Sequence, residues 1–187
     1  MSSRFEVLAT PIAGLHLLQR KPIADRRGYF ERLFCQAELS ELLSGKTIAQ
    51  INHTATERAG TVRGMHYQCP PFSEIKIVSC LRGEVFDVAI DLRRHSPTYL
   101  TWYGETLTAS NHKTMVIPEG FAHGFQALTD DCEMLYFHTA PYQSGAEAGL
   151  NARDARLGIA WPIVISEISP RDSTFPMLTN TFAGVVP

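Results

Sequence analysis

Five side chains able to move protons or to stabilise negative charge lie within residues 60–78, GTVRGMHYQCPPFSEIKIV. These side chains belong to Arg63, His66, Gln68, Glu74 and Lys76. A neutral imidazole is a suitable base near neutral pH, and a nearby cation can stabilise an oxyanion that forms when a proton is removed. A lone histidine is more often structural, but Lys76 interrupts an apolar strand pattern, and this favours a functional cluster.

The geometry of this cluster depends on Gly64. In regular pleating Arg63 and His66 point to opposite faces of a strand, because their separation is odd. A bulge at Gly64 would turn both side chains toward one cavity, and glycine is common at bulges.

Two other segments carry candidate residues on strand-like patterns. Residues 117–128, IPEGFAHGFQAL, place His123 in a turn between two strands, and residues 133–139, EMLYFHT, place Tyr136 and His138 on one strand face. Taken alone, His123 is more typical of a loop histidine, and Tyr136 of a core tyrosine with a hydrogen-bonded hydroxyl. Their combination with the first cluster is more specific than any one segment.

The elements that position these residues are mostly predicted strands. Residues 36–44, QAELSELLS, form the one helix candidate, because Leu39, Leu42 and Leu43 recur at helical spacing and Gly45 follows as a stop signal. Elsewhere apolar residues alternate and turn residues separate the runs, which is typical of an antiparallel sandwich or small barrel. The expected strands cover residues 75–81, 84–92, 98–103, 114–118 and 133–139.

The composition fits one globular domain over residues 1–187. Hydrophobic residues make up 44% and charged residues 19%, which argues against disorder. Lys and Arg number 17 against 19 Asp and Glu, with a pI near 6.4, so no overall basic charge indicates a nucleic-acid or membrane partner. No apolar run suits a spanning helix or a signal peptide, and the four cysteines form no CxxC pair. These features predict a soluble cytoplasmic protein without a disulfide scaffold or structural zinc site.

Four ordered motifs together resemble the dTDP-4-dehydrorhamnose 3,5-epimerase family of the cupin superfamily. They are GTVRGMHYQ, PP..E.K.V.C, GEVFDVAIDLR..SPTY..W and IPEGFAHGF, and the resemblance runs from DRRGYF (25–30) through LGIAWP (157–162) to SPRD (169–172). It implies a mostly β, cupin-type antiparallel jelly roll (a double-stranded β-helix) with a few short helices. It also implies a homodimer that epimerises C3, C5 or both of a nucleotide-linked 4-keto-6-deoxyhexose without a metal or organic cofactor.

The resemblance also implies roles for individual residues. His66 matches the family's general base, Asp172 the carboxylate that orients it, Tyr136 the proton donor and Lys76 the substrate-binding lysine. Further substrate contacts are implied at Arg27, Gln50, Asn52, Arg63, His123, Glu147 and Arg171, with Asp87 as an acidic residue near the catalytic histidine. In the implied dimer, Arg27 lies near the partner's site.

These residue types suit the implied reaction. The hydrogens on C3 and C5 flank the C4 ketone, so removal of either leaves an enolate with its charge on O4. A neutral imidazole can remove the proton, and a carboxylate on its other nitrogen fixes the tautomer. Lys76 or Arg63 could stabilise the oxyanion, while Tyr136 returns a proton to the other ring face. Arginine forks suit the diphosphate of the substrate.

The sequence departs from the family pattern at two places. Arg32 stands where the family has a glutamate of its substrate-binding set, with Glu31 one place early, and this puts the nucleotide in question more than the chemistry. The segment GLNARDARLG (149–158) lacks the family's tryptophan before Asp154.

Three alternatives remain open from the residues alone. A metal-dependent cupin could use His66, Glu74 and His123, but Gln68 replaces the second histidine of the HxH motif and Lys76 would bring a positive charge near the ion. A non-catalytic sugar-nucleotide module is another possibility, and it would leave the proton-transfer residues without a purpose. The third is a related epimerase that takes a different nucleotide sugar.

Overall fold

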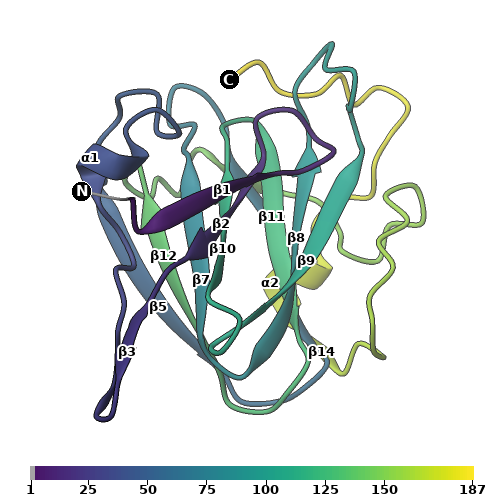
Figure 1. The fold of residues 1–187 in the computed structure, drawn as a ribbon. Coiled ribbons are helices and arrows are strands. Elements are labelled where there is room, and N and C mark those ends of the chain that lie inside the picture. The colour runs from purple at the N-terminus through teal and green to yellow at the C-terminus, as the bar shows by residue number, and fades with distance from the viewer. Residues whose placement is uncertain (1–2) are drawn as a thin grey trace.

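Short runs of alternating apolar residues form two six-stranded sheets and one small hairpin within residues 3–187, the part of the chain that this computed structural model describes (Figure 1). In spatial order the first sheet contains β1 (Phe5–Ala9), β2 (His16–Arg20), β10 (Lys113–Ile117), β7 (Lys76–Arg82), β12 (Cys132–His138) and β5 (Gln50–Thr56). The second contains β13 (Glu147–Gly149), β6 (Thr61–Gln68), β11 (Phe121–Ala127), β8 (Glu84–Asp91) and β9 (Trp102–Thr108), and β14 (Glu167–Ile168) also pairs with β6. The architecture is the cupin-type jelly roll that the motifs imply.

The main core lies between the two sheets. Val78 and Met134 from the first sheet pack in one buried cluster with Val85, Ala89 and Phe125 from the second. Burial of these side chains is the dominant favourable contribution to folding. Because the sheets face each other across this core, side chains from both can reach one cavity.

Strand β8 is buried on both faces. Its residues Val88 and Ile90 lie in a second apolar cluster that the C-terminal segments cover. The opposite face points between the sheets and carries Asp87, which is fully buried. The alternation read from the sequence is therefore correct, and it places this carboxylate inside the molecule.

The helix prediction over residues 36–44 is correct only for its first turn. Helix α1 covers Gln36–Leu39, after which the chain continues as turns. The hydrogen bonds change there: the Leu43 amide still donates to the Leu39 carbonyl, but the Ser44 amide donates only three residues back, to Glu41. Leu39 and Leu43 are nonetheless buried, so the apolar spacing reflects packing and not a long helix.

The predicted strand over residues 98–103 starts late, at Trp102, and continues to Thr108. The Asp91 carboxylate accepts hydrogen bonds from the Ser96 and Thr98 hydroxyls, and these bonds hold the preceding residues in a turn. Local side-chain bonds of this kind compete with strand pairing.

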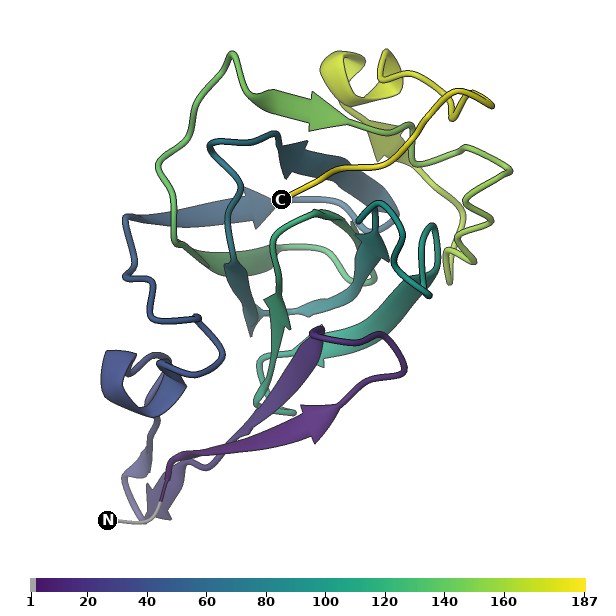
Figure 2. The same cartoon turned by 90° about the horizontal axis from the view of Figure 1, so that it is seen from above.

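Two peripheral segments matter for the site. The hairpin β3 (Ile23–Asp25) and β4 (Gly28–Phe30) extends from the first sheet at the lower left of Figure 1, and all its residues are exposed. Helix α2 (Pro170–Ser173) lies with β13 and β14 at the opposite edge of the molecule from the N-terminus (Figure 2). No helix of residues 3–187 is both long and apolar enough to cross a membrane.

Candidate active site

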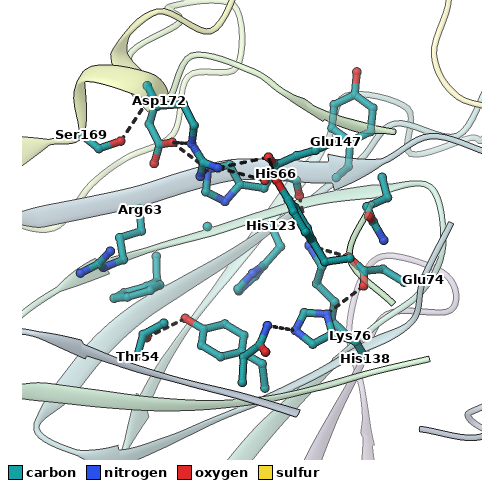
Figure 3. A pocket seen from close by; sticks show the side chains of 18 residues that line it. Thr54, Arg63, His66, Glu74, Lys76, His123, His138, Glu147, Ser169 and Asp172 are labelled. Carbon is teal, nitrogen blue, oxygen red and sulfur yellow. Dashed lines mark hydrogen bonds and ion pairs between the residues drawn. The ribbon is translucent and has the colours of Figure 1, made fainter. Parts of the chain in front are cut away.

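The segments chosen from the sequence meet around one cavity of about 470 Å³ (Figure 3). Strand β6 forms one wall, and strands β7 and β12 of the other sheet form the opposite wall. Nine of the twelve candidate residues line this cavity: Asn52, Arg63, His66, Lys76, His123, Tyr136, Glu147, Arg171 and Asp172.

His66 is held by a carboxylate that lies 106 positions later in the chain. Its Nε2 atom is 2.9 Å from Asp172 Oδ1, and the Gly64 amide donates to Asp172 Oδ2 at 3.1 Å. The Ser169 side chain caps helix α2 by accepting a hydrogen bond from the Asp172 amide, which fixes this carboxylate. Within residues 3–187, Nδ1 of His66 has no hydrogen-bond partner, so this nitrogen is available to a substrate.

The Asp172 carboxylate is ionised at neutral pH. Burial alone would raise its pKa, but the hydrogen bonds from His66 and the Gly64 amide, with the charge of Arg171, lower that pKa to about 2. An ionised carboxylate beside an imidazole stabilises the imidazolium that forms when the imidazole takes a proton.

The predicted bulge at Gly64 is confirmed. In the β6–β11 pairing His66 faces His123, and Arg63 faces Phe125, so three steps along β6 match two along β11. Gly64 has a φ of 122°, a conformation that other residues rarely adopt. Because of this extra residue, Arg63 and His66 both line the cavity.

Tyr136 lies on the wall opposite His66 and is 9% exposed. Its hydroxyl accepts one long hydrogen bond, 3.4 Å, from Thr54. Burial raises the pKa of Tyr136 well above its usual value, so the phenol stays protonated.

Lys76 lies near Tyr136, within a small charged group. Its Nζ atom is 3.3 Å from Glu74 Oε1 and 3.4 Å from the His66 carbonyl oxygen. The other oxygen of Glu74 is 2.8 Å from Nδ1 of His138. Burial alone would raise the pKa of Glu74, but the His138 hydrogen bond and the charge of Lys76 lower it. The group therefore contains a carboxylate that two neighbours share.

A third histidine–carboxylate pair lies deeper in the cavity. His123 Nε2 is 2.8 Å from Asp87 Oδ1, and its ring meets the Tyr136 ring edge-on at 6.1 Å. Asp87 Oδ2 is buried and has no hydrogen-bond partner in the described residues. Asp87 lies behind the lining and holds His123.

The mouth of the cavity carries a cation and an anion. The Arg171 guanidinium is 3.1 Å from Glu147 Oε2, and it also reaches Asp172 Oδ1 at 3.2 Å. The Tyr142 hydroxyl donates to the same Glu147 oxygen at 2.9 Å.

The two remaining candidates lie outside the lining. Gln50 stands behind Asn52 and donates to its side-chain oxygen at 3.0 Å. Arg27 is on the β3–β4 hairpin, where its side chain is 84% exposed and pairs with Asp25 at 2.6 Å. Its implied place at a partner's site stays a prediction.

Several lining residues were absent from the candidate set. Thr54 follows Asn52 by two positions, so strand alternation could have added it, whereas His138 was placed on the Tyr136 face from the sequence but was given no role. Tyr142 lies in a loop, where the sequence carries no such signal, and Ser169 belongs to the SPRD motif but was given no role.

The metal-ligand alternative does not match the arrangement of side chains. His66, Glu74 and His123 each contact a different partner. No group of three or more His, Cys, Asp or Glu side chains in residues 3–187 is placed to hold a metal ion.

The fold and the cavity together define an acid–base enzyme. An imidazole held by an ionised carboxylate faces a protonated phenol, and Lys76, Arg63 and Arg171 line the same cavity. Proton removal and return at a carbon next to a carbonyl group is the chemistry that these groups can perform.

The chain belongs to the dTDP-4-dehydrorhamnose 3,5-epimerase family, whose sequence model matches residues 9–180. It is 38% identical over 174 residues to the dTDP-4-dehydrorhamnose 3,5-epimerase of Salmonella typhimurium, covering 92% of this chain and 94% of that one. The solved epimerase of Bacillus anthracis, with TDP and PPi bound, is similar with a TM-score of 0.89 and 32% identity over 93% of this chain and 99% of that one. The Legionella pneumophila dTDP-6-deoxy-D-glucose-3,5-epimerase, in complex with dTDP-4-keto-L-rhamnose, gives a TM-score of 0.87 and 35% identity over 92% of each chain. The family and the fold implied by the motifs are confirmed.

Proposed function

We propose that this protein is an isomerase that epimerises C3, C5 or both of a dTDP-linked 4-keto-6-deoxyhexose. The single observation that carries the proposal is the placement of His66 and Tyr136 on facing walls of one cavity. Epimerisation removes a proton from one face of the sugar ring and returns one to the other. A base and an acid on opposite walls suit that requirement.

His66 is the proposed base. With Nε2 held by Asp172, its Nδ1 atom takes the hydrogen on C3 or C5, and the electron pair moves through the enolate to O4 of the ketone. The Lys76 ammonium then stabilises the oxyanion, an effect often worth ~3–4 kcal/mol in enzymes.

Tyr136 is the proposed acid. Its buried hydroxyl gives a proton to the opposite ring face as the enolate returns to a ketone. Solvent then returns a proton to the phenolate and takes one from the imidazolium. The raised pKa of Tyr136 keeps the phenol protonated before each turnover.

The anionic nucleotide is assigned to the two arginines that line the cavity. Arg63 and Arg171 can bind diphosphate oxygens in pairs, and Asn52 and Glu147 can bind hydroxyl groups. The ligands named in the solved relatives, TDP and a dTDP-linked keto sugar, support this class of substrate.

The assembly is proposed to be a homodimer in which Arg27 reaches the partner's site. Tyr29 is 59% exposed and Phe30 66% exposed on the same hairpin, and exposed aromatic clusters are typical of interfaces. We further propose a single domain that acts in the cytoplasm, with support from four cysteines that form no disulfide.

The residues at positions 31 and 32 are a reason to test nucleotides other than dTDP. Arg32 replaces the family's glutamate and pairs with Glu38, while Glu31 is held by Arg20 and His112. Arg32 has the opposite charge and Glu31 is already paired, so neither side chain supplies the unpaired carboxylate of the family's glutamate.

The test is an assay in D₂O with 4-keto-6-deoxyhexoses linked to dTDP, GDP, CDP and UDP. Proton NMR would report deuterium entry at C3 and C5 and the appearance of epimerised product. We expect the dTDP sugar to be exchanged and epimerised. Preference for another nucleotide would move the assignment to that substrate, and an absence of exchange with all four would contradict the epimerase function.

A further inference from the structure

We propose that Glu74 and His138 form a positioning pair that holds both the Lys76 ammonium and the Tyr136 phenol against the substrate. The inference rests on the proposed function and deepens it. It adds two residues that the family motifs do not place among the substrate contacts.

The strand register brings these groups together. The β7–β12 pairing sets Lys76 directly opposite His138, and both side chains line the cavity. Cross-strand partners on one face have Cβ atoms ~5 Å apart, which is close enough for one carboxylate to bridge them. Glu74 does so with one oxygen each, at 3.3 Å and 2.8 Å. The three side chains are between 8% and 12% exposed, so water does little to screen these contacts.

A chain of hydrogen bonds determines where the His138 proton lies. The Gln50 side-chain amide donates to Asn52 Oδ1, so the Asn52 nitrogen faces Nε2 of His138 at 3.4 Å. An amide nitrogen donates and does not accept, so Nε2 is the acceptor and the proton is on Nδ1. Neutral His138 then donates to Glu74, which keeps its negative charge for Lys76.

This sharing leaves Lys76 able to act. Its ammonium has three donors, and two of them face Glu74 and the His66 carbonyl oxygen. No third acceptor contacts Nζ within residues 3–187, so one N–H can reach the ketone oxygen. Without His138, both oxygens of Glu74 would be available to Lys76 and would draw the ammonium away from the cavity.

The same histidine supports the acid. The His138 and Tyr136 rings lie nearly parallel, with an angle of 18° and centroids 6.1 Å apart. Among the described residues the Tyr136 hydroxyl receives one long bond, from Thr54, so ring packing is its main restraint. Replacing His138 by another aromatic residue should therefore keep the packing against the Tyr136 ring, while loss of the Nδ1 donor disturbs Lys76.

Two substitutions separate these effects. His138→Phe keeps an aromatic ring but removes the donor, and His138→Asn restores an N–H near the Nδ1 position. We expect His138→Phe to lower kcat ~10- to 100-fold, with KM and the Kd of dTDP within about threefold of wild type. His138→Asn should recover most of the kcat.

The matched control is His53→Phe. His53 also pairs with a glutamate, Glu133 at 3.1 Å, but it is on the outer face of β5, and its side chain is 52% exposed. This variant should keep wild-type kcat and KM. A wild-type kcat for His138→Phe would overturn the inference. A loss of kcat that accompanies a fall in Tm and that His138→Asn does not rescue would also overturn it.

A second readout does not depend on activity. A ¹H–¹⁵N correlation spectrum should show His138 as the neutral tautomer protonated on Nδ1, and Glu74→Gln should change that signal. A tautomer protonated on Nε2 would contradict the pair even in an active enzyme. An absence of deuterium exchange in the wild type would instead contradict the proposed function itself, so the two failures are distinguishable.

Discussion

The two walls of the cavity are built in opposite ways. The wall of the proposed base, here called the base wall, has His66 on β6 with Asp172 from α2 and is partly open: the His66 side chain is 24% exposed. The wall of the proposed acid, here called the acid wall, has Lys76 on β7 with Tyr136 on β12 and is closed: the tyrosine is 9% exposed. The base wall also contains an irregular strand with a bulge, whereas register pairs along the acid wall are regular from Met134 to His138.

This difference suits the role proposed for each wall. A base must lose its proton to solvent after each turnover, so partial exposure and an ionised carboxylate partner serve it. An acid must remain protonated until the enolate forms, and burial favours the neutral phenol. We therefore predict that damage to the base wall stops proton removal, while loss of the Tyr136 hydroxyl affects mainly the stereochemical outcome.

The largest effect is expected for His66→Ala. Without the imidazole the proposed base is lost, so exchange at both C3 and C5 should fall by at least ~10³-fold while dTDP still binds. Deuterium entry followed by NMR, with calorimetry for binding, measures both quantities. Exchange at a near wild-type rate would remove His66 from its proposed role.

Asp172→Asn should have the next largest effect. The amide keeps the shape of the carboxylate but neither stabilises the imidazolium nor secures the tautomer, so kcat should fall ~10²- to 10³-fold with little change in binding. Asp130→Asn is a suitable control, because Asp130 also accepts a backbone amide bond, from Ala59, but at the exposed surface. Equal activity of the two variants would contradict the proposed role of the dyad.

Gly64→Ala tests the bulge of the base wall. An added Cβ would lie 2.6 Å from Gly124 Cα and 2.8 Å from the His123 carbonyl oxygen, at a φ that alanine rarely adopts. We expect a loss of ~2–4 kcal/mol in the free energy of unfolding and at least a ~10-fold loss of kcat.

The control for this variant is Gly145→Ala, where an added Cβ meets nothing within 4 Å. Urea denaturation should place the control within ~0.5 kcal/mol of wild type. Equal stability of the two variants would show that the bulge does not need glycine.

The smallest expected effect is on acid stability. The pKa of Asp172 is lowered from 3.8 to about 2, so its ionised form stabilises the fold fully above pH ~4, and this contribution is lost as the pH falls toward 2. The difference in unfolding free energy between wild type and Asp172→Asn should therefore shrink over that range. Tyr136→Phe, on the acid wall, should show no such change. A constant difference for Asp172→Asn would contradict the ionised dyad.

The acid wall was the easier one to predict from the sequence. Strand alternation alone places Tyr136 and His138 on one face, and the charge of Lys76 in an apolar strand marks its position. Glu74 was named in the first cluster, but its bridging role depends on strand register, which no single segment contains.

Predicting the base wall from the sequence required more than strand alternation. The bulge at Gly64 was predicted from the glycine, but the contact between His66 and Asp172 spans 106 positions, and only the family resemblance indicated it. The helix predicted over residues 36–44 and the strand predicted over residues 98–103 were partly wrong for a different reason. Local hydrogen bonds in the folded chain, such as those to Asp91, override periodicity.

The central claim is that the proton leaves toward one wall and returns from the other. Tyr136→Phe tests it most directly, through the ratio of deuterium exchange to epimerised product from the dTDP-linked 4-keto sugar in D₂O. We expect exchange to stay within ~10-fold of wild type while inversion falls ~100-fold, because the enolate still forms at His66 but regains its proton on the same face. Equal losses of exchange and inversion would contradict the claim, and unchanged product formation would remove Tyr136 from the mechanism.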